Sequence, residues 1–410
     1  MGGQPPRAGY PAGYQGGYDS GAGVPAAGDP YPRERKPRRK GALIAAAVVV
    51  LALLAGGSYV GVRFALARGE RTEAAPERTV TPERTETQPG GAASVPATDP
   101  AGTEVPAPPS LAKPVVVDRF DLGQEPEGVT VSPDNKTIFV ADQSSKDVHI
   151  VDVASKKVDV VKVPNTPRFL ALSPDGGRLY VTLFENNFTG NGLAVIDTAK
   201  KSLVKTIRTG PRPFEPAVAP DGTVWVPIHN GARVEIYDPQ SLTETARISV
   251  PPNPHWIVFT PDGATAFTAN HESSQISVVN VSDRLVRKNF KVGRSPHALA
   301  VTPDGKRLVV TNYDLDTVEV YDTGDQRLIH KVTVGKEPQA VMISADGKHA
   351  YIVNEGSDTL SVIALGDGKV VSTVGVGDSP RVNAISPDGR RLYVTDGGAK
   401  TVTVLRTTEE

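Results

Sequence analysis

The residues best suited to chemistry are histidines that recur at matching positions of a repeated pattern. His255 and His297 each follow a proline, whereas His229 and His271 each follow the end of a predicted strand. Imidazole nitrogens bind zinc, iron or nickel, and a histidine with an ordinary pKa of about 6.5 transfers protons near neutral pH. The pattern therefore predicts a group of histidines that serves a metal ion, an acid–base reaction or an organic ligand.

Three interpretations of these histidines stay open. In the first, His255, His271 and His297 hold a divalent metal ion, which is the only cofactor that the sequence suggests. In the second, they line a site for an organic or peptide ligand. In the third, they are polar loop residues without a specific role, because metal ligands must converge within roughly 2.0–2.2 Å of one ion, and this is difficult for side chains from separate repeats.

A wider ring of candidate ligand-binding residues follows from the same repeat. A proline stands eight residues before each of seven Pro-Asp or Ala-Asp turns, and the side chain after that proline changes from one repeat to the next. Variable side chains on a repeated backbone are typical of a binding surface. With residues that follow the next strand, they give the predicted ligand-binding set Glu127, Arg168, Phe214, His229, His255, His271, His297, Gln339, Glu355 and Arg381.

Within this set, His255, His297 and Arg381 are the candidates for catalysis, which would require a convergent acid–base pair. The chain contains no Gly-x-Ser-x-Gly motif and no Gly-rich phosphate loop. It also contains no Cys, which excludes disulfides, thiolate zinc sites and a Cys nucleophile. Because no convincing triad is present, the sequence favours binding over catalysis.

The repeat determines the expected fold of residues 114–410. Its unit is about 42 residues long and contains runs that alternate apolar and polar residues with period two, such as Thr317–Asp322. This alternation is typical of β-strands, and four short strands in a unit of this length make one propeller blade. Seven units therefore predict an all-β, seven-bladed β-propeller.

The two ends of the repeat region indicate how the ring closes. The chain finishes at Thr401–Leu405, a third strand with no fourth strand after it. It begins with Val115–Phe120, which aligns with the fourth strands of the other units. We expect this N-terminal strand to complete the seventh blade, and closure of this kind leaves no long sheet edge exposed.

Several strands carry a recognisable signature after the Pro/Ala-Asp-Gly turn, among them Leu179–Thr182, Tyr351–Asn354 and Leu392–Asp396. On these residues, residues 114–410 resemble the YVTN-repeat β-propellers, a family similar to surface-layer proteins, periplasmic propellers and sugar-lactone hydrolases. The resemblance implies the seven-bladed fold. For function it implies a ligand- or protein-binding scaffold or, alternatively, a lactonase-like hydrolase or metal-binding enzyme with its site at the channel mouth.

Composition divides residues 1–113 into three segments. Residues 1–40 are rich in Gly, Pro and Tyr and end in a Lys/Arg cluster at 33–40, which predicts a disordered tail. Residues 41–62 carry no charge and are long enough as a helix to cross a hydrocarbon layer of about 30 Å. We expect an uncleaved signal anchor there, with a cleaved signal peptide or a buried helix as alternatives. The Pro/Thr-rich composition of residues 63–113 predicts a disordered extracytoplasmic linker.

These segments predict a single-pass bacterial membrane protein with a cytoplasmic N-terminus and an extracytoplasmic propeller. The expected partners are the membrane, through residues 41–62, and a cell-envelope protein, peptide or glycan. The chain has 45 Lys+Arg and 46 Asp+Glu, and this near balance gives no strong signal for nucleic-acid binding. The predicted function is a membrane-tethered binding or scaffold module of the cell envelope.

Overall fold

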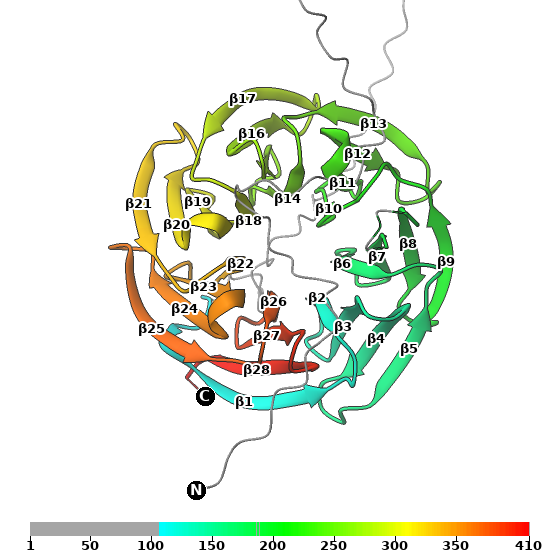
Figure 1. Ribbon diagram of the computed structural model, residues 1–410, viewed down its shortest axis with the longest axis horizontal. Helices are drawn as coiled ribbons and strands as arrows, with labels where there is room; N and C mark the ends of the chain where they lie inside the picture. Colours follow the sequence, from blue (N-terminus) through cyan, green and yellow to red (C-terminus); the bar gives the residue numbers. More distant parts are fainter. Residues whose placement is uncertain (1–105, 186, 188, 410) are drawn as a thin grey trace, which may run out of the picture. The chain divides into compact units, whose positions relative to one another are not determined.

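The computed structural model describes residues 106–409, apart from positions 186 and 188. The predicted tail, the predicted span 41–62 and most of the predicted linker lie outside these residues. Within the described part of the chain, no helix is long and apolar enough to cross a membrane. The propeller prediction is confirmed, because seven antiparallel sheets of four strands each surround one central axis (Figure 1).

Blades 1 to 4 follow one another along the chain, and the first strand of each is the innermost (Figure 1). Blade 1 contains β2 (Pro126–Val131), β3 (Thr137–Asp142), β4 (Asp147–Asp152) and β5 (Val158–Lys162); blade 2 contains β6 (Pro167–Leu172), β7 (Arg178–Leu183), β8 (Gly192–Asp197) and β9 (Ser202–Ile207); blade 3 contains β10 (Ala217–Val218), β11 (Val224–Ile228), β12 (Arg233–Tyr237) and β13 (Glu244–Ser249); blade 4 contains β14 (Pro254–Phe259), β15 (Thr265–Asn270), β16 (Gln275–Asn280) and β17 (Leu285–Lys291).

Blades 5 and 6 repeat this plan, and blade 7 takes its outer strand from the N-terminal side of the propeller. Short 3-10 turns follow the second strand in blades 3, 5 and 6: η1 (His229–Gly231), η2 (Tyr313–Leu315) and η3 (Glu355–Ser357). Blade 5 contains β18 (Pro296–Val301), β19 (Arg307–Asn312), β20 (Thr317–Asp322) and β21 (Leu328–Thr333); blade 6 contains β22 (Pro338–Ile343), β23 (His349–Asn354), β24 (Thr359–Ala364) and β25 (Lys369–Gly375); blade 7 contains β26 (Pro380–Ile385), β27 (Arg391–Asp396), β28 (Thr401–Thr408) and β1 (Ser110–Asp121).

The packing of the blades explains the sequence pattern of the strands. The first three strands of each blade lie between neighbouring blades, so both of their faces are covered and they are apolar almost throughout, as in β19. The fourth strands face solvent, and β9 is exposed along nearly its whole length. Large side chains such as Tyr180, Tyr351 and Tyr393 are completely buried in second strands. The core is therefore a series of layers between blades.

The Pro-Asp turns have the structural role that the sequence indicates. In blade 5, the Asp304 carboxylate accepts hydrogen bonds from Thr302 Oγ1 at 2.6 Å and from the Lys306 backbone N–H at 3.1 Å. Gly305 then takes a φ of 72°, a left-handed conformation that glycine adopts without steric cost. These bonds fix the turn between the first and second strands, so the aspartates are committed to structure.

Closure of the ring by β1 is confirmed. β1 pairs antiparallel with β28 along Val115–Asp121, and its first residue also reaches blade 6. Ser110 donates from its backbone N–H to Asp346 at 2.9 Å and from its hydroxyl to the same carboxylate at 2.7 Å. Since β1 begins at Ser110, the closing strand starts ahead of residue 114, where the sequence places the start of the propeller.

Blade 3 departs from the regular plan at its inner strand. β10 has two residues, whereas the inner strands of the other blades have six. Pro213 and Pro216 flank Phe214 and Glu215 at this point, and a proline has no N–H to donate to a sheet. The inner edge of blade 3 is consequently an irregular segment that brings different side chains to the axis.

We expect Ser110→Ala to lower the free energy of unfolding of the full chain by about 1 kcal/mol, because the variant loses the hydroxyl contacts of Ser110 with Asp346 and His349. Urea unfolding measures this loss. Ser282→Ala is the matched control, since the Ser282 hydroxyl bonds to half-buried Asn280 within its own turn. Equal stability of the two variants would argue against a contribution of this contact to closure.

Candidate functional site

The ten predicted ligand-binding residues lie around the propeller axis at the end where the inner strands begin, and we call them the axial ring. Seven of them follow the prolines that start the inner strands or, in blade 3, precede β10. The other three, His229, His271 and Glu355, follow second strands. All except Glu355 are buried. We expected these side chains to form an open variable surface, but they pack against one another across the narrow centre.

The four histidines of the axial ring form one cluster. The ring centroid of His255 lies 4.1 Å from that of His297, 5.0 Å from that of His271 and 5.4 Å from that of His229. Phe214 covers His255 from blade 3 with a centroid separation of 3.7 Å. The structure therefore brings together, from blades 3, 4 and 5, the histidines that the repeat count singled out.

The hydrogen bonds of these histidines differ. Nδ1 of His297 lies 2.8 Å from the backbone oxygen of Gln339, and because a carbonyl only accepts, Nδ1 carries the proton there. His229 Nδ1 lies 2.7 Å from Asn230 Oδ1, and its Nε2 lies 3.5 Å from Glu272. His255 is completely buried, yet neither of its ring nitrogens has a hydrogen-bond partner among the described residues.

Burial keeps three of the clustered histidines, His229, His255 and His297, neutral. It lowers the pKa of His229 to about 3 and the pKa values of His255 and His297 well below their ordinary range, with the neighbouring histidines adding to the effect for His255. A general acid or base works best when its pKa lies near the operating pH. The electrostatics of the cluster thus favour a neutral donor and acceptor of hydrogen bonds over a proton-transfer pair.

The predicted metal ligands His255, His271 and His297 contact one another mainly through their ring faces and edges. Within the described residues, no group of three or more His, Cys, Asp or Glu side chains is arranged to hold a metal ion. The imidazoles present nitrogen donors of a type that zinc or nickel accepts. A metal at this position stays a prediction, and it would require the side chains to turn toward a common point.

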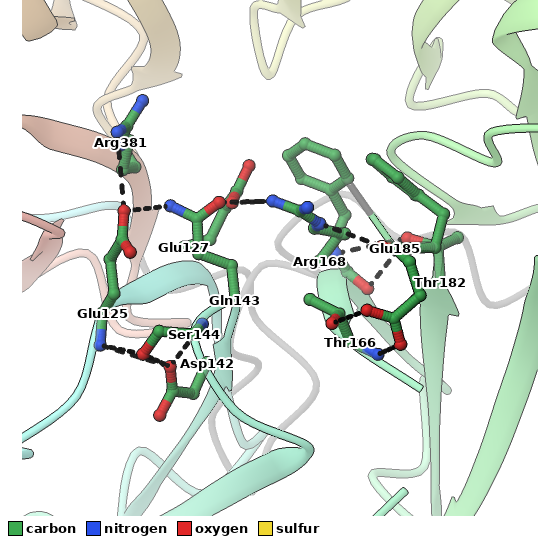
Figure 2. A network of polar contacts seen from close by, with 12 residues as sticks. Glu125, Glu127, Asp142, Gln143, Ser144, Thr166, Arg168, Thr182, Glu185 and Arg381 are labelled. Carbon is green, nitrogen blue, oxygen red and sulfur yellow. Dashed lines mark hydrogen bonds and ion pairs between the residues drawn. The ribbon is translucent and has the colours of Figure 1, made fainter. Parts of the chain in front are cut away.

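The opposite side of the axial ring carries charged residues from blades 6, 7, 1 and 2, and Figure 2 shows part of it. Arg168 pairs with Glu127 at 3.2 Å and donates to Gln143. Arg381 pairs with Glu355 and lies 3.8 Å from Glu125. Each of the two arginines is therefore paired with a carboxylate of a neighbouring blade. The two guanidinium groups are not arranged as a clamp for an anionic ligand.

Further hydrogen bonds connect this charged side into a network. Gln143 donates from its amide nitrogen to Glu125 at 2.7 Å, and Tyr313 donates to Glu355 at 3.2 Å (Figure 2 shows the Gln143 contact). Burial raises the pKa values of Glu125 and Glu355, and the Arg381 guanidinium opposes this shift in both. The network contains the three carboxylates of Glu125, Glu127 and Glu355 but only two arginines, Arg168 and Arg381.

Sequence analysis missed several residues of the site. Glu125 directly precedes a repeated proline, and Phe169 and Trp256 stand two places after one. Comparison of the positions on both sides of each proline would have found them.

The residues before the proline in blades 3 to 7 also adopt left-handed φ values, for example 57° at Arg212 and 64° at Asn253. Since five blades share this strain, it belongs to the turn and not to one ligand contact.

Two surface pockets lie away from the axial ring, among the turns between first and second strands. One, of about 540 Å³, is lined by residues of blades 1 and 2, including Asp134, Asp175 and Lys201. The other, of about 390 Å³, lies between blades 4 and 5 beside Asp262 and Asp304. Their turn aspartates are engaged in hydrogen bonds that fix the turns. These pockets are therefore weaker candidates than the axial ring.

Comparison with protein families supports the repeat assignment. Residues 217–408 match the YNCE-like beta-propeller family. The matched stretch begins at β10 and ends with β28, so it includes His229, His255, His271 and His297. The resemblance to a family of repeat propellers is thereby confirmed at the level of the fold.

Among solved structures, this chain is similar to hydrazine synthase of Kuenenia stuttgartiensis, with 22% sequence identity and a TM-score of 0.64. The alignment covers 72% of this chain and 98% of that chain. At this identity the likeness supports the fold alone. The search of curated proteins gives no match.

We expect His255→Leu to raise the free energy of unfolding by about 1 kcal/mol, because Leu has a similar volume and removes two buried nitrogens that have no protein partner. Urea unfolding of the full chain at pH 7.5 provides the measurement. His330→Gln, on the outer strand β21, is the control and should change stability little. A destabilised His255→Leu variant would indicate that His255 contributes favourably to the folded state.

We also expect stability to decrease as the pH falls from 7 toward 5. Unfolded histidine takes up a proton below about pH 6.5, whereas His229, His255 and His297 stay neutral in the folded state, so the unfolded state binds more protons. Each histidine contributes up to about 1.4 kcal/mol per pH unit below 6.5. The raised pKa of Glu215 acts in the opposite direction. The slope should be smaller in His255→Leu, and identical slopes would contradict this explanation.

Proposed function

We propose that the chain is a ligand-binding module of the cell envelope, whose ligand contacts the axial ring, and that it has no catalytic role of its own. The observation that carries this proposal is the state of His255. This imidazole is completely buried and has no hydrogen-bond partner on either nitrogen within residues 106–409 as described, which costs stability, and such costs are concentrated at functional sites. A ligand that supplies a donor or acceptor at His255 would recover this energy.

The surroundings of His255 are consistent with recognition of a small polar molecule. Phe214 lies over the imidazole with its ring tilted by 36°, and His297 approaches it edge to face at 66°. A neutral imidazole can donate one hydrogen bond and accept another. Binding sites typically combine apolar and aromatic walls with a few placed polar groups. The arrangement of axial-ring residues therefore supports a ligand with both aromatic or aliphatic and polar parts.

The predicted catalytic set supports hydrolysis less well. His255 and His297 are in contact, but burial keeps both neutral far below pH 7, and Arg381 is engaged by Glu355 and Glu125. A lactonase-like reaction would need a water positioned by a base with a pKa closer to the working pH. Binding requires no such group.

The location of the module is part of the proposal. The uncharged segment 41–62, preceded by the Lys/Arg cluster at 33–40, would hold the propeller outside the cytoplasmic membrane. A ligand of the envelope, such as a peptide, a glycan or a partner protein, would then meet the propeller on the outer side. Protease accessibility of the propeller in intact cells tests this placement.

We expect at least one compound from a panel of tri-alanine, N-acetylglucosamine, citrate, choline and zinc chloride to stabilise the full chain against heat. A ligand that binds only the folded state at 100 times its Kd adds about 2.7 kcal/mol of stability, which raises the melting temperature measurably. The increase should be lost in His255→Leu and kept in His330→Gln. If the two variants respond alike to every compound, the proposed role of the axial ring in binding is wrong.

A further inference from the structure

Glu215 differs in chemical type from the residues at the same position of the other blades. Two places after the repeated proline, the other blades carry glycine, apolar or aromatic residues: Gly128, Phe169, Trp256, Ala298, Ala340 and Val382. Only blade 3 of the described propeller carries a charged residue there. The same blade has the short inner strand β10, and the irregular segment before it contains Glu215.

The equivalent residues of the two neighbouring blades are aromatic. Phe169 of blade 2 and Trp256 of blade 4 approach each other edge to face with ring centroids 6.4 Å apart, although blade 3 stands between them in chain order. Phe169 also lies 5.1 Å from Phe214, the neighbour of Glu215 in the chain. Aromatic rings from the two flanking blades thus meet beside Phe214, the residue that directly precedes Glu215 in the short inner segment of blade 3.

The position of Glu215 is fixed toward blade 4. Its backbone N–H donates to the backbone oxygen of His255 at 3.3 Å, which joins the inner segments of two adjacent blades. Oε2 of its carboxyl group is buried and has no hydrogen-bond partner among the described residues. Burial, together with the nearby carboxylate of Glu127, raises the pKa of Glu215 well above its ordinary value. The carboxyl group therefore favours its protonated form in the unliganded chain, and a cation placed beside it would favour the carboxylate.

The cations of the surrounding residues are engaged elsewhere. Arg168 pairs with Glu127 and stacks over Phe184 at 4.6 Å. Arg212 stacks over Phe214 at 5.1 Å and lies 3.5 Å from His229. No ion pair joins Glu215 to a Lys, Arg or His of the described residues. Within the described propeller, a negative charge at Glu215 therefore has no cationic partner, and a bound cation could supply one.

We propose that Glu215, with Phe169 and Trp256, binds an organic ammonium group. A carboxylate supplies the counter-charge, and aromatic faces attract cations and quaternary ammonium groups in particular. An anionic ligand would be repelled by Glu215 and Glu127. A divalent metal ion that binds carboxylates needs further oxygen ligands, and the aromatic rings of Phe169 and Trp256 do not supply them. The ligand class is thus an amine or quaternary amine with an apolar surface.

This inference rests on the proposed function and adds the chemical class of the ligand. It assigns the cationic end of the ligand to Glu215 and the polar remainder to His255, whose backbone is already bonded to Glu215. Glu215 and His255 thus meet at the junction of blades 3 and 4 through this backbone hydrogen bond. Separate substitutions can therefore distinguish the two contacts.

Isothermal titration calorimetry of the full chain with choline chloride, at constant ionic strength, tests the inference. We expect saturable binding that is at least about tenfold tighter than that of 3,3-dimethyl-1-butanol, the uncharged compound of the same shape. Glu215→Gln, which keeps the size of the side chain, and Trp256→Leu should each weaken choline binding at least about tenfold. Glu244→Gln on the exposed strand β13 is the control and should bind choline as the unaltered chain does.

Equal binding of choline and the neutral alcohol would overturn the inference, as would unchanged choline binding by both Glu215→Gln and Trp256→Leu. Absence of saturable choline binding to the unaltered chain would overturn it as well. These results are distinguishable from failure of the proposed function. Heat stabilisation by another compound of the panel that depends on His255 would keep the axial ring as a binding site and remove only the ammonium assignment.

Discussion

The pairing of β1 with β28 is the interaction on which the rest of the structure depends. A propeller blade cannot bury its inner strands alone, since their faces are covered only by the two adjacent blades. Without β1, blade 7 would end at an open edge in β28, and the layer between blades 7 and 1 would lose support. The axial ring also depends on closure by β1, because Arg381 of blade 7 and Glu125 before blade 1 meet across the closing seam.

Closure also explains why the axial ring carries groups that an isolated sheet would not tolerate. Seven inner segments converge on one axis, so side chains with little room are buried even where they are charged. On one side, arginines from one blade hold carboxylates of the next, as Arg168 holds Glu127. On the other side, imidazoles stay neutral and pack on aromatic rings. The ring is therefore polar in composition but largely buried, which strengthens each electrostatic contact within it.

The sequence predicts the fold almost completely because the fold is periodic. The prolines and Pro-Asp turns mark each blade, and strand ends such as Asn312 and Asn354 lie where the repeat places them. The site is predicted only in part. Periodicity locates His255 and His297 next to each other, but it does not reveal that Arg381 is engaged by Glu355 or that His255 is fully buried. Those properties arise from contacts between blades, and the irregular backbone around Glu215 follows no repeat.

The order of strands in blade 7 has a mechanical consequence. All residues before Ser110 join the propeller through β1, whose contacts run antiparallel along β28 and extend to Asp346 of blade 6. A force directed along β1 would load many of its backbone hydrogen bonds to β28 together instead of opening them one after another. Such a force would be resisted by the same strand that closes the ring, and rupture of its pairing with β28 would open the propeller and its axial ring at the seam.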